Sequence, residues 1–328
     1  MANLSDVLKS VEKKYGKGTV INFEDDRFDD AECISSGSLS LDLALGGGYA
    51  VGRIIEIFGE ESSGKTTLAI HAVSNFQKRF PERAVLYIDV ENAFDTFYGE
   101  SLGISYKKDQ WLFSQPRSGE EAFDIIDDMI KSGEISLIVV DSVAALIPRA
   151  ELEGEYGESK MGLHARLMSQ AMRKLVSMIS KYKCTVIFIN QLRDKIGVMF
   201  GDSKTTTGGH ALKFYSTQRL EVARAGQEKD GDEVTANKTR VRVKKNKIAP
   251  PFRKAEFNIV FGEGIDATGE IINMASEAEI IKKAGSWYSY GEVKLGQGLE
   301  SAKRLLKDNP ELFEEIEGKL KKYLGLID

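Results

Sequence analysis

The sequence of 328 residues has two cysteines, three histidines and no apolar run long enough to cross a membrane. Cys33 and Cys184 cannot form a disulfide framework, so we expect two reduced thiols in a reducing compartment. The first residues lack a basic segment followed by an apolar stretch, which predicts a cytoplasmic protein. The histidines show no metal-ligand spacing, so we expect ordinary structural roles for them.

Charge is nearly balanced, with 45 Lys and Arg against 50 Asp and Glu, a formal net charge of −5. This mild acidity argues against a protein that coats nucleic acid through bulk charge, but it permits locally basic loops. Cations gather in residues 192–213 and 240–254, whereas residues 24–32 hold six acidic residues and one Arg, as a solvated linker would. The 42% of hydrophobic residues excludes a disordered or fibrous chain.

Four apolar runs, at residues 54–58, 84–88, 137–140 and 186–189, predict parallel strands covered on both faces. Amphipathic patterns at 122–130 and 168–179 predict helices between them, so the fold class is an α/β doubly wound, mostly parallel sheet. Apolar and polar residues alternate between 220 and 261, which predicts an antiparallel extension of the sheet. Past residue 269 the pattern is again mainly helical, with Pro310 in the first turn of the last helix. At the start, apolar residues at helical spacing and the run 19–21 predict a short helix and a strand.

Residues 59–66, Gly-Glu-Glu-Ser-Ser-Gly-Lys-Thr, match the pattern G-x-x-x-x-G-K-[ST] directly after the first predicted strand. In such a loop, backbone N–H groups hold phosphate oxygens, Lys65 neutralises the β- and γ-phosphates, and the Thr66 hydroxyl ligates Mg²⁺. A plain glycine turn is the alternative. The pattern predicts a site for ATP and Mg²⁺.

Polar residues follow the other three predicted strands, and ligands bind at this edge in open α/β sheets. Asp141 ends the third run as a Walker-B acid that holds the Mg²⁺ shell through water. Glu91 follows the second run, where it either activates the attacking water or caps a helix. Gln191 follows the fourth run, where it either senses the γ-phosphate or serves a structural role.

Two glycine-containing segments, 150–162 and 192–209, predict functional loops. Met199 and Phe200 lie in the middle of the second. They either pack as satellite core or insert between bases of a nucleic acid.

Together these residues resemble the bacterial RecA recombinase family. The resemblance rests on residues 37–42, 61–67, 139–146, 168–175, 189–191, 197–201, 205–209 and 245–249, and it extends from about Tyr15 to Tyr323. It implies an ATP-hydrolysing recombinase that forms helical filaments on single-stranded DNA and catalyses homologous pairing and strand exchange in recombination, DNA repair and the SOS response. The expected partners are single-stranded DNA, duplex DNA, further copies of the chain and a LexA-type repressor.

The resemblance also implies residue roles. Lys65, Glu91, Gln191, Lys245 and Lys247 are expected to be catalytic, the two later lysines reaching the phosphates from the adjacent subunit, although a solvated strand face is their alternative. The expected nucleotide contacts are Gly59, Glu60, Glu61, Ser62, Ser63, Gly64, Lys65, Thr66, Thr67, Asp95, Tyr98 and Asp141, with Tyr98 stacking on adenine. The expected DNA contacts are Met161, Gly162, Arg166, Arg173, Met199, Phe200, Gly208 and Gly209.

On this basis we expect an N-terminal helix and strand for subunit assembly (1–32), a RecA-like ATPase core with DNA-binding loops (33–268) and a small α+β C-terminal domain (269–328). The alternatives are a hexameric, helicase-like DNA motor and a nucleotide-gated scaffold. The sequence departs from the family pattern at Glu60 and Thr96, where Pro is usual, and at Asn92, where His is usual. It also ends at Asp328 without the frequent acidic tail, so we expect readier engagement of duplex DNA.

Overall fold

The computed structural model describes residues 3–16, 19–20, 31–155, 162–194 and 204–327. The chain divides into two units, Met1–Glu32 and Cys33–Asp328. In the first, α1 (Leu4–Tyr15) confirms the predicted helix, and its apolar residues Leu4, Val7 and Leu8 are exposed. The strand predicted at 19–21 is wrong where it is described: Thr19 and Val20 form a bend, and Ile21 lies outside the described residues. A strand needs a partner for its backbone hydrogen bonds, and the described part of this unit contains none.

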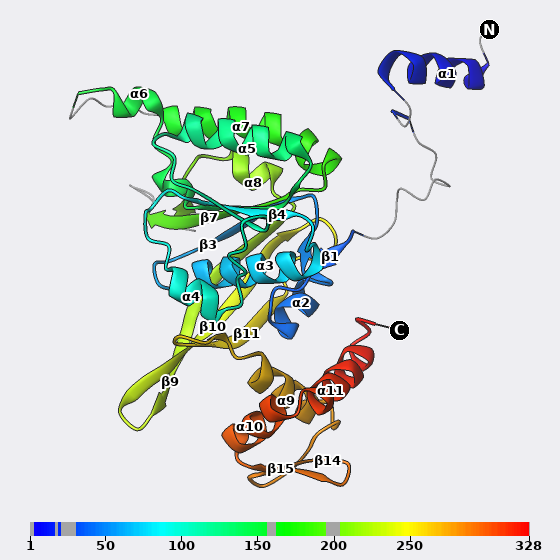
Figure 1. Cartoon of the computed structure of the whole chain (residues 1–328), viewed down its shortest axis with the longest axis vertical. Helices are drawn as coiled ribbons and strands as arrows, with labels where there is room; N and C mark the ends of the chain where they lie inside the picture. The colour runs from blue at the N-terminus through cyan, green and yellow to red at the C-terminus, as the bar shows by residue number, and fades with distance from the viewer. Residues whose placement is uncertain (1–2, 17–18, 21–30, 156–161, 195–203, 328) are drawn as a thin grey trace. The chain divides into compact units, whose positions relative to one another are not determined.

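The second unit is built on one large mixed sheet (Figure 1). Its strands in spatial order are β12 (Gly264–Ile265), β11 (Lys254–Val260), β10 (Glu233–Asn246), β9 (Gln218–Asp230), β3 (Ile54–Gly59), β7 (Thr185–Asp194), β6 (Ile135–Asp141), β4 (Ala84–Asp89) and β5 (Trp111–Ser114), and β8 (Lys204–Thr206) pairs with β7. The four predicted strands are confirmed and parallel. Their order is β3-β7-β6-β4, which differs from the order in the chain.

Helices cover both faces of this sheet (Figure 1). α3 (Lys65–Arg79) packs on one face, and α5 (Gly119–Ser132), α7 (Leu163–Lys181) and α8 (Ala211–Tyr215) pack on the other. Successive residues of each strand therefore enter two different cores. In β3, for example, Ile55 and Ile57 belong to the α3 core and Ile54 to the α7 core. Burial on both sides explains the unbroken apolar runs of the sequence.

The predicted antiparallel extension is formed by β9, β10, β11 and β12. β9 joins it to the parallel part because it runs parallel to β3, with Val222 opposite Gly59. The alternating pattern did not predict this junction. It brings β10 and β11 close to the end of β3, where the glycine loop begins.

The end of the chain forms a small α+β domain, as predicted. It contains α9 (Ala267–Glu277), β13 (Lys282–Ala284), β14 (Trp287–Tyr290), β15 (Val293–Gln297), α10 (Leu299–Asp308) and α11 (Pro310–Tyr323) around a separate apolar core. Glu270 of α9 accepts hydrogen bonds from the backbone of Leu39 (2.9 Å) and Ser40 (3.1 Å) at the N-terminus of α2 (Leu39–Leu45). A carboxylate at a helix N-terminus is stabilising, so this contact attaches the domain to the sheet unit.

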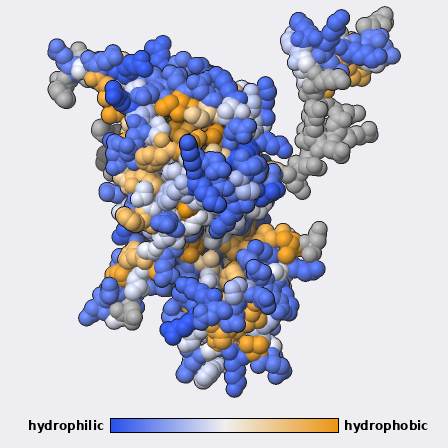
Figure 2. Space-filling model, in the orientation of Figure 1, coloured by the Kyte–Doolittle hydropathy of each residue, from blue (hydrophilic) through white to orange (hydrophobic). Residues whose placement is uncertain are grey.

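Short elements complete the second unit: β1 (Cys33–Ile34), β2 (Tyr49–Ala50), α4 (Thr96–Ser101), the 3₁₀ turn Val143–Ala145 and α6 (Arg149–Leu152). The two cysteines are not linked by a disulfide, as expected. Hydrophilic residues predominate on the face shown in Figure 2, and hydrophobic residues gather there in separate patches. No helix in the described part of the chain is long and apolar enough to cross a membrane.

Candidate active site

The glycine loop joins the end of β3 to the start of α3, as the motif predicted. Gly64 has φ +101°, a conformation that favours glycine, and a Cβ there would lie 2.5 Å from Cδ1 of Ile259, so that this side chain would have to shift. Among the described residues, no side chain caps the first N–H groups of α3. They carry the positive end of the helix dipole, so this end of α3 is suited to an anion.

Lys65 lies within the loop and is only 8% exposed. Its Nζ donates to the backbone oxygen of Glu60 at 2.6 Å. Burial lowers its pKa, while the nearby carboxylates of Asp141, Glu91 and Glu61 act in the opposite direction. A buried ammonium with three donors is well placed to bind an anion more strongly than it binds one carbonyl oxygen.

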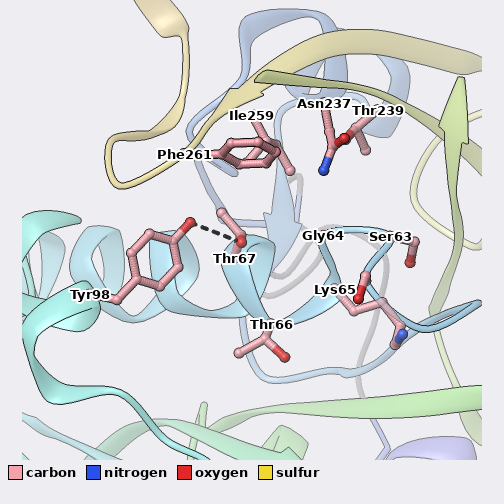
Figure 3. Close-up of a pocket in the computed structure, with 11 residues that line it drawn as sticks. Ser63, Gly64, Lys65, Thr66, Thr67, Tyr98, Asn237, Thr239, Ile259 and Phe261 are labelled. Carbon is pink, nitrogen blue, oxygen red and sulfur yellow. Dashed lines mark hydrogen bonds between the residues drawn. The ribbon is translucent and has the colours of Figure 1, made fainter. Parts of the chain in front are cut away.

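A cavity of about 220 Å³ opens beside the loop (Figure 3). It is lined by Ser62, Ser63, Gly64, Lys65, Thr66, Thr67, Tyr98, Asn237, Thr239, Ile259 and Phe261. Figure 3 shows the last four on the strand side of the cavity, across from the first turn of α3. Tyr98 and Thr67 share a hydrogen bond of 3.1 Å between their hydroxyl oxygens.

Three buried polar atoms of this lining have no hydrogen-bond partner in the described part of the chain: Ser63 Oγ, Asn237 Oδ1 and Thr239 Oγ1. Buried polar atoms are normally paired, so the cavity fits a polar ligand. No motif of the sequence indicated Asn237 or Thr239. Their spacing of two places both on one face of β10, and a polar pair on the inward face of a strand was the available signal.

Asp141 stands at the tip of β6, next to α3. Its Oδ2 accepts hydrogen bonds from Thr66 Oγ1 (3.0 Å) and Tyr87 OH (2.8 Å). Burial raises the pKa of Asp141, and these two hydrogen bonds oppose the shift. The hydroxyl and carboxylate expected to hold Mg²⁺ are therefore brought together, although they lie 75 residues apart in the sequence.

Glu91 lies beyond the end of β4, whereas Gln191 lies within β7, which continues to Asp194, so the segment expected to be a loop from residue 192 begins as strand. Glu91 Oε1 accepts hydrogen bonds from Gln191 Nε2 (3.0 Å) and from the Ser142 hydroxyl. Both donors engage the same carboxylate oxygen. The expected base, Glu91, and the expected γ-phosphate sensor, Gln191, are thus in direct contact. Ser142 is a further neighbour that no motif of the sequence indicated.

The two expected adenine contacts differ in placement. Tyr98 lines the cavity, whereas Asp95 is not among its lining residues and caps α4 by accepting a hydrogen bond from the backbone of Tyr98 at 3.0 Å. Gly59, Glu60 and Glu61, at the start of the loop, and Asp141, at the tip of β6, are also not among the lining residues.

The departures from the family pattern have local explanations. Glu60 is paired with Lys204, which lowers the pKa of Glu60 and offsets its negative charge beside the loop. Asn92 has φ +55°, a left-handed conformation that Asn tolerates better than most residues. Nothing in the structure explains Thr96. Its backbone oxygen accepts a hydrogen bond of 2.8 Å from Tyr106.

Lys245 and Lys247 are not brought to the loop of their own chain. Lys245 pairs with Arg219, which pairs with Glu56 near the start of β3. The loop follows Gly59 at the other end of β3, about 10 Å away along the strand. The ammonium of Lys245 donates to the backbone oxygens of Lys213 and Phe214, both at 2.8 Å.

The expected DNA contacts that are described surround the start of α7. Arg166 and Arg173 are exposed and seven residues apart on this helix, and Arg173 donates to Ser169 Oγ at 2.8 Å. Gly162 precedes the helix with φ +84°. Gly209 has φ +72°, and a Cβ there would lie 2.8 Å from that of Ala165, so Gly208 and Gly209 pass close to α7. Met161, Met199 and Phe200 lie outside the described residues.

Comparison with known proteins gives two family models that together cover nearly the whole chain. The RecA N-terminal domain matches residues 2–266, and the RecA C-terminal domain matches residues 269–325. A protein named Protein RecA from Bacteroides thetaiotaomicron is 55% identical over 316 residues, which are 96% of this chain and 94% of the relative. Relatives of the same name from Porphyromonas gingivalis (55%; 95% and 91%) and Levilactobacillus brevis (53%; 100% and 86%) are similar along comparable lengths.

Proposed function

The chain belongs to the RecA family, and we propose that it works as that family's DNA-dependent ATPase and recombinase. It forms helical filaments on single-stranded DNA and catalyses homologous pairing and strand exchange in recombination, DNA repair and the SOS response. The observation that carries this function is the hydrogen bond between Glu91 and Gln191. It joins the candidate base, Glu91, to Gln191, the residue directly before the expected DNA loop, 192–209.

ATP is the nucleotide that fits the site, with the loop and the first turn of α3 holding its phosphates. The unpaired hydroxyls of Ser63 and Thr239 support a polar ligand in the cavity. Thr66 and, through water, Asp141 would hold Mg²⁺, which supplies positive charge to the phosphate oxygens during transfer. Tyr98 offers its ring to the base, and Asp95 fixes the helix that carries Tyr98.

Glu91 would accept the proton of the attacking water. Because Ser142 and Gln191 both donate to Oε1, they fix the orientation of the carboxylate and leave Oε2 to act as the base. Lys65 balances the charge of the transferred group from inside the loop. Gln191 is placed to change its hydrogen bond when a phosphate group occupies the site.

Lys245 and Lys247 would complete the site from a neighbouring subunit. Their distance from the loop of their own chain supports a role in trans, where they act on transition-state charge as arginine fingers do. The exposed apolar face of α1 suits docking on a further copy, so residues 1–32 would be the assembly arm, 33–268 the ATPase core and 269–328 the C-terminal domain. Head-to-tail contacts of this kind build open helices.

Segments 154–162 and 192–209 would bind DNA, with Arg166 and Arg173 beside them on α7. A cytoplasmic location and an interaction with a LexA-type repressor complete the proposal. The match to both RecA family models along nearly the whole chain favours a recombinase over the hexameric motor.

The test is ATPase activity with and without single-stranded DNA across a salt series. We expect stimulation by DNA that weakens as salt rises, because phosphate contacts release counterions. A rate of ATP hydrolysis that is the same with and without single-stranded DNA would contradict the proposal. Negative-stain images with single-stranded DNA and a slowly hydrolysed ATP analogue should show filaments, and closed rings would support the motor instead.

A further inference from the structure

Asn190 precedes Gln191 within β7. Its side chain makes the four hydrogen bonds that an amide offers. Its Nδ2 donates to Glu56 Oε1 (2.9 Å) and to the backbone oxygen of Thr207 (3.1 Å). Its Oδ1 accepts from Thr207 Oγ1 (2.5 Å) and from the backbone N–H of Gln191 (2.9 Å). The side chain is fully buried. One amide therefore binds the next residue of β7, Gln191, and also Thr207, 17 positions further along the chain.

Glu56 fixes which way this amide points. A carboxylate oxygen only accepts, so the amide must turn its NH₂ group toward Glu56 and its oxygen toward the Thr207 hydroxyl and the Gln191 N–H. Glu56 is itself fully buried and is held by the guanidinium of Arg219, which stacks over the Phe58 ring at 4.6 Å. A buried charge pair of this kind is costly unless it is fully hydrogen-bonded, so its presence indicates a positioning role.

Asn190 lies two residues before the segment 192–209 expected to bind DNA, and Thr207 lies near the end of that segment. Their reciprocal pair of hydrogen bonds closes the base of that segment. Asn190 also holds the backbone of Gln191, whose side chain contacts Glu91. The same amide is thus bonded both to the stem of the loop and to the residue that reads the nucleotide site.

We propose that Glu56, Asn190 and Thr207 form a polar clasp that fixes the stem of the DNA loop to Gln191, so that nucleotide state and DNA binding are coupled through it. The three are positioning residues, and none of them is among the residues that line the nucleotide cavity. This inference rests on the proposed function, because it assumes that the segment 192–209 binds DNA. It gives a role to three residues for which neither the motifs nor the resemblance implied one.

The test compares Thr207→Val, which keeps the shape of the side chain and removes its hydroxyl, with Thr207→Ser, which keeps the hydroxyl. The readout is the concentration of oligothymidylate that gives half-maximal stimulation of ATP hydrolysis at saturating ATP. We expect Thr207→Val to raise that concentration about fivefold or more, as the loss of one buried hydrogen bond does, and Thr207→Ser to behave as the wild type. If Thr207→Val fails to fold, Thr207→Ala removes the same hydroxyl without added bulk.

Nucleotide affinity in the absence of DNA separates coupling from a general structural defect. Equal losses of nucleotide affinity and DNA response in Thr207→Val would overturn the clasp, as would a Thr207→Ser variant that is as impaired as Thr207→Val. If DNA stimulates the wild type and the Thr207→Val variant needs the same concentration of oligothymidylate for half-maximal stimulation, the clasp is overturned and the proposed function is not. A wild type that DNA does not stimulate would overturn the proposed function and the clasp together.

Discussion

Glu91 and Gln191, one hundred residues apart in the sequence, are joined by a hydrogen bond of 3.0 Å. Glu91 follows the end of β4, Gln191 lies within β7, and β6 lies between these two strands. The bond crosses the tip of β6, where Asp141 and Ser142 stand. A change in the position of Glu91 can therefore reach the segment 192–209 through the side chain of Gln191.

Replacing Gln191 should separate nucleotide binding from DNA stimulation. Gln191→Asn shortens the side chain by one methylene and breaks the contact with Glu91, so we expect the DNA-stimulated kcat to fall about tenfold or more. Nucleotide affinity should stay near the wild-type value, because Gln191 does not line the cavity. Steady-state kinetics and equilibrium nucleotide binding measure the two effects. Equal changes in both would contradict a sensing role.

Glu91→Gln should remove the base and keep the shape of the side chain. We expect hydrolysis to fall by roughly 10²-fold or more, the usual contribution of general base catalysis. Filament assembly on single-stranded DNA with ATP should persist, since assembly needs bound nucleotide and not turnover. Phosphate release and electron microscopy check the two parts. Undiminished turnover would remove Glu91 from the mechanism, and a scaffold that hydrolyses little would show no large difference.

Lys65→Ala should weaken nucleotide binding. A charge-assisted hydrogen bond contributes about 1.5–3 kcal/mol, so we expect a roughly 10- to 100-fold loss of ATP affinity. Lys78→Ala is a matched control, because Lys78 lies exposed in the last turn of the same helix. Isothermal titration with a slowly hydrolysed ATP analogue measures both variants. Similar losses in the two would indicate an effect on α3 as a whole.

The pair formed by Glu60 and Lys204 should tune the affinity for nucleotide. Without the lysine, the Glu60 carboxylate stands uncompensated beside the phosphate loop, so Lys204→Met should weaken ATP binding by about two- to fivefold, and more at low salt. Adding Glu60→Gln to that variant should restore the affinity. A double variant that remains as weak as Lys204→Met would show that Lys204 acts independently of Glu60.

Asp42 should make stability depend on pH. Burial raises its pKa to about 6 from an ordinary 3.8, so between these values the folded state binds more protons than the unfolded state. Stability therefore falls as pH rises from about 4 to about 6 and is level above that. The melting temperature of the wild type relative to Asp42→Asn should decline across this window, as calorimetry can measure. Asp109→Asn, at an exposed aspartate, is the control, and equal pH profiles for wild type and Asp42→Asn would contradict the assignment.

The sequence by itself determined the local elements and the chemistry of the loop. The nearly unbroken apolar runs identified β3, β4, β6 and β7, because strands buried on both faces leave few polar positions. The glycine motif located Lys65 and Thr66, because a phosphate loop restricts the backbone and therefore the residue types. The strand-end rule pointed to Glu91, Asp141 and Gln191.

Only the tertiary structure decided what these residues contact. The order of the strands brings Gln191 to Glu91 and Thr66 to Asp141, and hydrophobic periodicity carries no information on strand order. Asn237 and Thr239 reach the cavity because β9 pairs with β3, a choice made by packing across more than 150 residues of chain. The bonds of Asn190 to Glu56 and Thr207 arise in the same way, since side-chain hydrogen bonds between distant segments depend on the assembled sheet and not on any local pattern.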